Sequence, residues 1–504
     1  MSLAIVYTRA QVGIDAPLVT VEVHLSGGLP SFSIVGLPET AVKESRERVR
    51  SALINSGYDF PQRRITVNLA PADLPKEGGR YDLAIAMGIL AASAQVSAES
   101  LTSLELIGEL ALSGALRPVA GVLPVALACR EAKRGLLLPA ANGDDATLAS
   151  GLNVYPANHL LDVCAHLKGE QLISCAIAKS FEHSYQAVYP DLSDVKGQFQ
   201  AKRALEIAAA GSHNLLLVGP PGSGKSMLAN RLPGLLPDMT ESERLQVASI
   251  HSIAQRSGGE GLMCQRPFRA PHHTASSVAL VGGGGNPKPG EISLAHQGVL
   301  FLDELPEFSR KVLEVLREPI ESGEILISRA ARQSVFPARF QLVTAMNPCP
   351  CGYYSDGSER CRCSPDQVRR YQSRVSGPLL DRIDLQLSVQ ALSQKELMAF
   401  PEAQETSEQV RARVILSRGR QIERQGYPNQ LLEGKQLEQI CCIGEADKEM
   451  LAQALEKLQL SARAYHRVLR VARTIADLAG VDQVERNHLL EALSYRVSAR
   501  TVLQ

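Results

Sequence analysis

One segment of eight residues constrains the fold of this chain more than any other. It reads GPPGSGKS and matches the pattern G-x-x-x-x-G-K-[ST], with an apolar run before it and a helix-forming run after it. Glycines there let backbone N–H groups turn toward a phosphate, and the start of the following helix adds positive potential. We therefore expect a strand–loop–helix unit that binds the phosphates of ATP. Its loop residues are Gly219, Pro220, Pro221, Gly222, Ser223, Gly224, Lys225 and Ser226.

Polar residues after this loop and after two further apolar runs complete a candidate site. The Lys225 ammonium is expected to contact the outer phosphates, and the Ser226 hydroxyl is expected to bind Mg²⁺. The run GVLFLDE ends in Asp303, which would hold Mg²⁺ through water, and Glu304, which would polarise the attacking water. The run FQLVTAM leads to Asn347, whose amide would orient that water or touch the γ-phosphate.

The apolar runs are short, as are strands of a parallel sheet that is covered on both faces. They comprise Leu215–Val218, Val299–Leu302 and residues 341–345. We expect the paired acids to lie at the tip of a strand adjacent to the phosphate loop.

Changes along the chain predict three domains in an α/β fold. Residues 1–172 alternate strand and helix patterns, as an α+β domain does, and residues 173–194 form a polar linker. Residues 195–395 carry the nucleotide motifs in an α/β core. Residues 396–504 are predicted to be helical.

Composition limits the partners and the location of the chain. Lys+Arg and Asp+Glu both number 53, so the formal net charge is zero and any contact with nucleic acid must be local. Aromatic residues make up only 4%, which excludes base stacking as the main device. We find no secretory signal and no run of about 18 apolar residues that would cross a membrane. Ten cysteines in a chain of this length are not a disulfide scaffold, so a cytoplasmic location is expected.

Two arginines are candidates for contacts with the γ-phosphate. Arg382, in GPLLDRIDL, lies after the core strands, where an arginine finger for a neighbouring subunit would lie. A surface arginine paired with its flanking aspartates is the alternative. Ser461 can cap the helix of SARAYHRVLRVARTIADLAG. Arg463 begins this helix and could reach back from a lid, although three further arginines share it.

Together these segments resemble the magnesium-chelatase-like branch of the AAA+ proteins, in particular the ComM/YifB family, over nearly the whole chain. Besides the phosphate loop, the resemblance rests on GVLFLDELPEF, AMNPCPCGYY, GPLLDRIDL, SARAYHRVLRVARTIADLAG and SFSIVGLPETAVKESRERVRSAL. It implies a Lon-protease-like N-terminal domain, an AAA+ core, a C-terminal helical lid and a homo-hexameric ring. It also implies ATP-driven DNA helicase and branch-migration activity during natural transformation, with Arg382 as the finger in trans and Arg463 as the lid sensor.

The resemblance to Lon can be checked against the Ser–Lys dyad of that protease. In LPKEGGRYDLAIAMG, Arg80 aligns with the nucleophilic serine, and in RPVAGVLPVALA, Leu123 aligns with the lysine. A guanidinium is not a nucleophile and leucine is not a base. We therefore predict no peptidase activity.

Two segments are candidates for contact with DNA. Residues 323–340 predict a β-hairpin whose tip carries Arg329 and Arg332. In the ring ATPases that this branch resembles, such a hairpin points into the pore, where arginines would grip the phosphate backbone without reading sequence. Lys288, beside a glycine-rich loop, is the second candidate. The alternatives are a solvated hairpin tip and a plain flexible connection.

Four cysteines form a C-x-C-x₉-C-x-C pattern: Cys349, Cys351, Cys361 and Cys363. Four thiolates suit tetrahedral Zn²⁺, although the one-residue gap within each pair is tighter than the usual C-x₂-C. A redox-sensitive loop and unligated thiols are the alternatives. The adjacent His272 and His273 are interpreted as structural.

Three functions compete. The favoured hypothesis is a hexameric DNA motor. The second is a magnesium-chelatase-type ATPase that remodels a protein partner. The third, an ATP-dependent protease, lacks its dyad.

Overall fold

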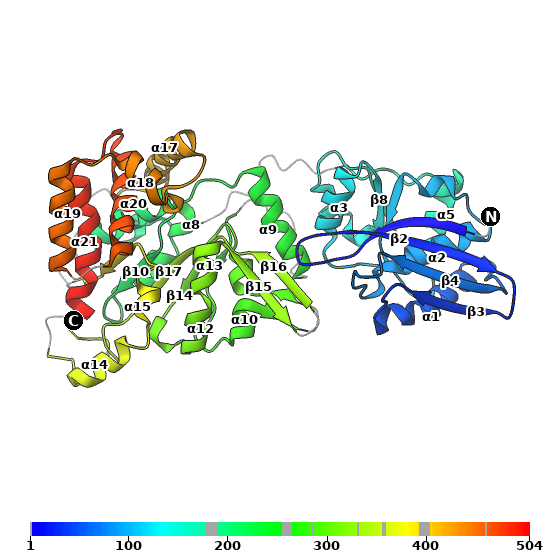
Figure 1. Cartoon of the computed structure of the whole chain (residues 1–504), viewed down its shortest axis with the longest axis horizontal. Helices are drawn as coiled ribbons and strands as arrows, with labels where there is room; N and C mark the ends of the chain where they lie inside the picture. Colours follow the sequence, from blue (N-terminus) through cyan, green and yellow to red (C-terminus); the bar gives the residue numbers. More distant parts are fainter. Residues whose placement is uncertain are drawn as a thin grey trace. The chain divides into compact units, whose positions relative to one another are not determined.

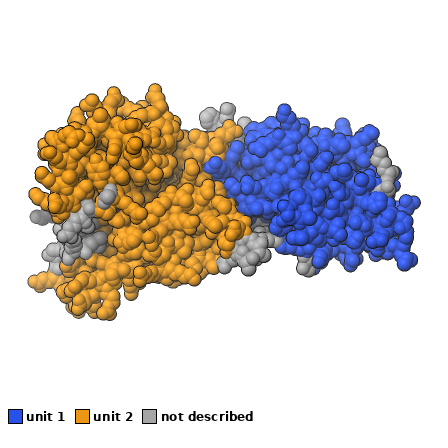
Figure 2. All heavy atoms as spheres, viewed as in Figure 1, with its two compact units in different colours: residues 1–184, 244–263 blue, residues 185–243, 264–504 orange. Residues whose placement is uncertain are grey.

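The computed structural model describes residues 3–177, 189–254, 265–284, 287–329, 332–354, 359–392, 404–458 and 461–503. The chain forms two compact units, which are coloured separately in Figure 2. The first unit comprises residues 1–184 and 244–263, and the second comprises residues 185–243 and 264–504. Helix α9 (Glu241–Ile253) therefore begins in the second unit and continues into the first, although the whole helix lies within the predicted core of residues 195–395.

The first unit is built on a mixed seven-stranded sheet with the strand order β3-β4-β2-β1-β5-β8-β9. The pairs β1–β2 and β2–β4 are antiparallel, and the other neighbours are parallel. The strands are β1 (Leu3–Arg9), β2 (Leu18–Ser26), β3 (Ser31–Val35), β4 (Arg64–Ala70), β5 (Leu104–Leu106), β8 (Gly135–Pro139) and β9 (Val154–Ala157). The helices are α1 (Thr40–Asn55), α2 (Asp82–Ala92), α3 (Val122–Glu131), α4 (Gly143–Thr147) and α5 (Leu160–Lys168).

Helix α2 is the centre of this unit, and all of its residues are buried. It packs on the alternating apolar face of β2, where Val19, Val21 and Val23 are buried. Gly88 makes the close approach possible, because a Cβ at this position would lie 2.5 Å from Cγ2 of Val23. An amphipathic pattern is absent from α2 because the helix has no solvent-facing side.

The second unit contains a parallel five-stranded sheet with the order β11-β14-β17-β10-β18. Its strands are β10 (Leu215–Val218), β11 (Phe268–Arg269), β14 (Val299–Leu302), β17 (Gln341–Met346) and β18 (Leu385–Ser388). Every residue of β10, β14 and β17 is buried, as the short apolar runs predict. The sheet confirms the α/β character of the fold.

Two small antiparallel pairs accompany this sheet. The predicted hairpin is confirmed as β15 (Glu324–Arg329) paired with β16 (Arg332–Pro337). The second pair is β12 (Gly282–Gly283) with β13 (Lys288–Pro289). They lie side by side, because a Cβ at Gly282 would be 2.8 Å from Cδ1 of Ile327.

Apart from α9, the helices of the second unit form two groups along the sequence, one between residues 199 and 380 and one between residues 407 and 503 (Figure 1). The first group comprises α6 (Phe199–Gly211), α7 (Lys225–Ala229), α8 (Leu232–Leu235), α10 (Ser277–Val281), α11 (Glu291–Leu294), α12 (Arg310–Val315), α13 (Arg317–Ser322), α14 (Pro365–Gln372) and α15 (Gly377–Leu380). The second comprises α17 (Ser407–Gln425), α18 (Gly434–Cys441), α19 (Glu445–Lys457), α20 (Ala462–Ala479) and α21 (Arg486–Leu503).

The C-terminal helices share one apolar core with the sheet. Helix α20 packs on α6, and α21 packs on β18. Leu215 and Leu385 of the sheet belong to the same buried cluster as Val468 of α20. Among the described residues, none of the helices combines the length and the apolar character needed to cross a membrane.

Candidate nucleotide-binding site

The loop between β10 and α7 has the backbone that its glycines predict. Gly222 and Gly224 adopt positive φ angles of 78° and 89°, which side chains disfavour. A Cβ at Gly219 would lie 2.1 Å from the carbonyl oxygen of Val389, so only glycine fits there. The sequence therefore folds locally into a strand, a glycine-rich turn, and a helix that begins at Lys225.

Lys225 is buried and points back into this loop. Its ammonium donates to the carbonyl oxygens of Gly219 at 2.8 Å and Pro220 at 2.9 Å, and to Oδ1 of Asn347 at 3.2 Å. Burial lowers the pKa of Lys225, while the negative charges of Asp303 and Glu304 act in the opposite direction. A phosphate offers this cation a stronger acceptor than neutral oxygens. Lys225 and Asn347 are thus in direct contact beside the loop.

Ser226 and Asp303 also come together. The Ser226 hydroxyl donates to Oδ2 of Asp303 at 2.6 Å, and Oδ1 of Asp303 accepts the backbone N–H of Glu304 at 2.9 Å. A hydroxyl and a carboxylate side by side are hard oxygen donors of the kind that Mg²⁺ prefers. Ser226 and Asp303 are therefore the residues that would hold this ion.

The order of the strands differs from the expected one. The tip of β14, which carries Asp303 and Glu304, is separated from β10 by β17, so the acids do not lie on the strand adjacent to the phosphate loop. They still reach the loop because the carboxyl ends of parallel strands open on one edge of the sheet. Asn347, after β17, lies between the loop and the acids in this order.

Sequence reasoning missed a partner of Glu304. Nδ1 of His273 lies 3.2 Å from Oε2 of Glu304, and the two side chains are 31% and 52% exposed. The backbone of Glu304 has a φ of 54°, a left-handed conformation that is uncommon for residues other than glycine. His273 also contacts the ring of His272, with centroids 4.1 Å apart. The only sequence signal was the pair of adjacent histidines.

Arg382 is buried within its own chain. Its Nη2 lies 2.7 Å from Oε1 of Glu321, and its Nη1 donates to the carbonyl oxygen of Pro378 at 2.8 Å. An open cavity of about 380 Å³ adjoins it. The residues that line the cavity are Glu314, Arg317, Glu318, Glu321, Ser322 and Arg382. A contact between Arg382 and a neighbouring subunit would require release from Glu321, and the role of finger stays a prediction.

Arg463 is exposed on the first turn of α20, which Ser461 caps as predicted. The three other arginines of this helix have structural partners. Arg467 binds Asp384 at 2.6 Å, Arg470 donates to the carbonyl oxygen of Leu432 at 2.6 Å, and Arg473 binds Asp477 at 2.9 Å. Within the described part of α20, Arg463 is therefore the arginine that is available to a ligand.

A buried polar cluster joins α20 to the sheet. Asp384 accepts the Asn214 backbone N–H at 3.0 Å and lies 3.7 Å from Nδ1 of His213, in addition to its bond with Arg467. Burial alone would raise the pKa of Asp384, but the charge of Arg467 and the contact with His213 hold it well below its usual range. Asp384 therefore stays ionised and anchors the last helices beside the strand that leads into the phosphate loop.

The candidate DNA contacts lie on the two adjacent hairpins. Arg329 pairs with Arg332 in the register of β15 and β16, at the tip, and the side chains of both lie outside the described residues. Lys288 is exposed on β13. The contact of Gly282 with Ile327 brings this strand pair against the arginine hairpin.

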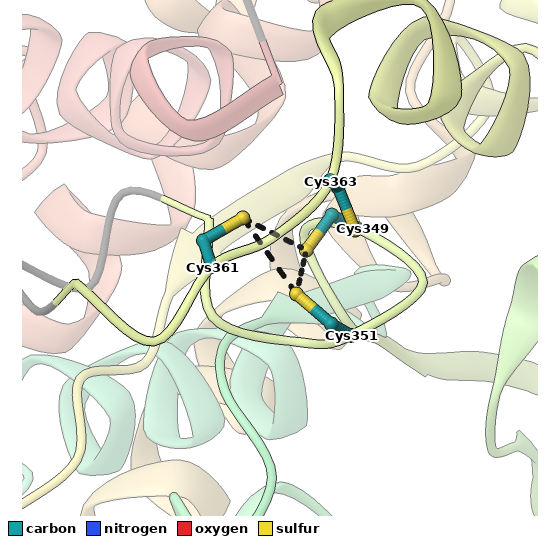
Figure 3. A group of neighbouring side chains, drawn as sticks. All are labelled: Cys349, Cys351, Cys361 and Cys363. Atoms are coloured by element: carbon teal, nitrogen blue, oxygen red, sulfur yellow. Dashed lines mark hydrogen bonds between the residues drawn. The ribbon is translucent and has the colours of Figure 1, made fainter.

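The four cysteines of the C-x-C-x₉-C-x-C pattern also converge. Their sulfur atoms all lie within 4.8 Å of one another, and Figure 3 shows the side chains turned toward a common centre.

Family models match most of the chain. The model described as "Magnesium chelatase, subunit ChlI" matches residues 191–397, "Subunit ChlI of Mg-chelatase" matches residues 21–142, and "Magnesium chelatase, subunit ChlI C-terminal" matches residues 404–496. The first and last of these ranges lie close to the predicted core and helical segments.

Full-length relatives give the same picture. The chain is 55% identical to competence protein ComM of Haemophilus influenzae, over 99% of this chain and 98% of the relative. It is 51% identical to the YifB protein of Escherichia coli, over 100% and 99%. The magnesium-chelatase 38 kDa subunit of Rhodobacter capsulatus is 25% identical over 62% of this chain and 88% of that protein. The chain therefore belongs to the ComM/YifB family of magnesium-chelatase-like proteins.

Proposed function

We propose that this protein is an AAA+ ATPase that works on DNA as a homo-hexameric ring, with helicase or branch-migration activity on recombination intermediates. The observation that carries the ATPase part is the convergence of Lys225, Ser226, Asp303 and Asn347 at one edge of the parallel sheet. Full-length similarity to a competence protein supports DNA as the substrate of the motor.

Each residue of the site then has a defined task. Lys225 binds the outer phosphates in place of the carbonyl oxygens that it now contacts. Ser226 and Asp303 hold Mg²⁺, which when bound neutralises charge on the phosphates. Glu304 accepts a hydrogen bond from the water that attacks the terminal phosphorus, and Asn347 orients that water or contacts the γ-phosphate. Arg463 acts from the lid of the same chain, and Arg382 acts on the neighbouring subunit.

The adjacent hairpins support the DNA part. Arg329, Arg332 and Lys288 belong to two strand pairs that meet where Gly282 approaches Ile327, in a chain whose formal net charge is zero. Contacts to phosphates alone suit a motor that must move along any sequence.

The test uses purified full-length protein and three DNA substrates: single-stranded, forked and four-way. We expect DNA to stimulate ATP hydrolysis and the protein to unwind the branched substrates at low salt with Mg²⁺ and ATP. Glu304→Gln should bind the same DNA without unwinding it. Absence of both stimulation and unwinding would refute the DNA motor.

A chelatase-type remodelling ATPase is the second candidate, and the 25% identity to a magnesium-chelatase subunit favours it. ATP hydrolysis that ignores DNA, together with co-purification of a metal-insertion protein, would select this function.

The N-terminal unit argues against a protease. If this domain is Lon-like, the dyad positions hold Arg80, whose guanidinium donates to Gln11 and to the carbonyl oxygen of Ala120, each at 2.7 Å, and Leu123, which is buried. Neither residue supplies a nucleophile or a base. Casein degradation that depends on Glu304 would overturn this conclusion.

A further inference from the structure

The distances among three of the converging sulfur atoms match a single tetrahedral metal ion, and the sulfur of Cys363 lies within 4.8 Å of each of them. Sγ of Cys349 lies 3.3 Å from that of Cys351 and 3.9 Å from that of Cys361, and the sulfurs of Cys351 and Cys361 are 3.6 Å apart. A zinc–thiolate bond of about 2.3 Å in tetrahedral geometry separates its sulfurs by ~3.8 Å. A disulfide would bring two sulfurs to about 2.05 Å. An iron–sulfur cluster would hold its thiolates farther apart than one ion does.

The chain path explains how the tight C-x-C spacing is accommodated. Cys349 follows the end of β17 by three residues, and the N–H of Gly352 donates to the Cys349 carbonyl oxygen at 3.0 Å, closing a turn around Cys351. Cys363 directly precedes Ser364, which caps α14 with a full capping box. Gln372, at the end of α14, donates to the carbonyl oxygen of Pro348 at 3.0 Å. This bond holds the end of the helix beside the first cysteine pair, Cys349 and Cys351.

Packing alone does not account for the convergence. Cys349 is buried, but the other three thiols are only half-buried, whereas a cysteine that acts as a small apolar side chain is normally fully buried. Exposed or half-buried cysteines need no shared centre, yet all four sulfurs have one. The nine cysteines within the described ranges are all free thiols, so no disulfide competes for these four.

The loop of these cysteines also contacts the phosphate loop. A Cβ at Gly352 would lie 2.5 Å from Cδ of Pro221 and 3.7 Å from Cγ of Asn347. Asn347 in turn accepts from Lys225, and only Pro348 separates it from Cys349. The position of the cysteine loop therefore fixes one wall of the candidate nucleotide site.

We propose that Cys349, Cys351, Cys361 and Cys363 bind one Zn²⁺ as four thiolates, and that this ion braces Gly352 and Asn347 against the phosphate loop. Binding transfers the thiol protons to solvent and leaves a centre with two net negative charges, next to the basic residues Arg360 and Arg362 in the sequence. The metal site stands without the proposed function, whereas the effect on nucleotides rests on it.

The metal content of the full-length protein tests the site. Protein reconstituted with Zn²⁺ alone under reducing conditions, then desalted, should carry about one zinc per chain by elemental analysis. Co²⁺ in its place should give the ligand-field absorption of tetrahedral cobalt thiolate. The double variant Cys361→Ser, Cys363→Ser spares the buried Cys349 and should lose the metal. The double variant Cys175→Ser, Cys442→Ser changes two exposed cysteines outside the cluster and should keep it.

Three results would overturn the assignment: no stoichiometric metal in the wild type, iron in place of zinc, or unchanged zinc in the Cys361/Cys363 variant. The bracing is tested by removing the metal with a chelator and measuring ATP turnover. We expect a loss of about tenfold or more, because a misplacement of site residues by about 1 Å can cost up to about a hundredfold in rate, and recovery on adding Zn²⁺. Unchanged turnover in metal-free protein would refute the bracing, while the zinc stoichiometry would be unaffected if the proposed function itself were wrong.

Discussion

The substitution Asp384→Asn tests whether the buried ion pair anchors the last helices to the sheet. The new amide can still accept from the Asn214 N–H, but its NH₂ group would face the guanidinium of Arg467, where Oδ1 of Asp384 now lies 2.6 Å away. The side chains of Asp384 and Arg467 are 0% and 12% exposed, so water can do little to replace the lost interaction. Removing one partner of such a pair costs about 3–5 kcal/mol.

Thermal unfolding followed by calorimetry measures this loss. Because the second unit is large, we expect its transition to fall by roughly 5–10 °C. The control is Asp366→Asn, which removes a surface ion pair whose side chains are 82% and 78% exposed, and which should shift the transition by at most about 1–2 °C. An unchanged transition in Asp384→Asn, or an equal shift in both variants, would refute the reasoning.

The same pair predicts a dependence on pH. The pKa of Asp384 is depressed in the folded state, so its contribution to stability is complete above the unfolded pKa of about 3.9. It is lost as the pH falls from there toward the lower folded pKa. The difference in stability between wild type and Asp384→Asn should therefore be constant above about pH 5 and shrink below about pH 4. A difference that grows in acid would contradict the assignment.

Three further substitutions test the site and the hairpins. His273→Ala removes the partner of Glu304 and should lower ATP turnover about tenfold with little change in KM, whereas His272→Ala should change neither. Gly352→Ala should weaken ATP binding, because the added Cβ would overlap Pro221. The control is Gly426→Ala: Gly426 has a φ of 83°, close to the 85° of Gly352, but open space surrounds it, so ATP binding should stay intact. The double variant Arg329→Ala, Arg332→Ala should weaken DNA binding, measured by titration at several salt concentrations. The slope of the logarithm of the binding constant against the logarithm of salt concentration should become less steep by about one to two units. The control is Arg369→Ala, which removes an exposed arginine.

The sequence predicted the elements that local patterns specify. The strands Leu215–Val218 and Val299–Leu302 have the predicted bounds, because a short apolar run that ends in a polar motif leaves little choice of register. The hairpin of residues 323–340 and the Ser461 cap also follow from local chemistry. Lys225, Asn347, Ser226 and Asp303 meet because motifs at the ends of parallel strands converge on one edge.

Other features depend on contacts between distant parts of the chain. The placement of β17 between β10 and β14 is a property of the whole sheet, which no single run encodes. The contact of His273 with Glu304 and the burial of Arg382 against Glu321 join residues that no motif links. The sequence also gave no sign that α9 is divided between the two units, because its pattern of apolar and polar residues is that of an ordinary amphipathic helix.

ATP binding and ATP turnover, measured side by side on two variants, test the central claim most directly. Lys225→Ala should fail to bind ATP with Mg²⁺, since it removes the cation that faces the phosphates. Glu304→Gln should bind ATP with wild-type affinity and hydrolyse almost none of it, since only the group that activates water is lost. If both variants bind and hydrolyse ATP like the wild type, the residues assembled at this edge of the sheet are not the catalytic site.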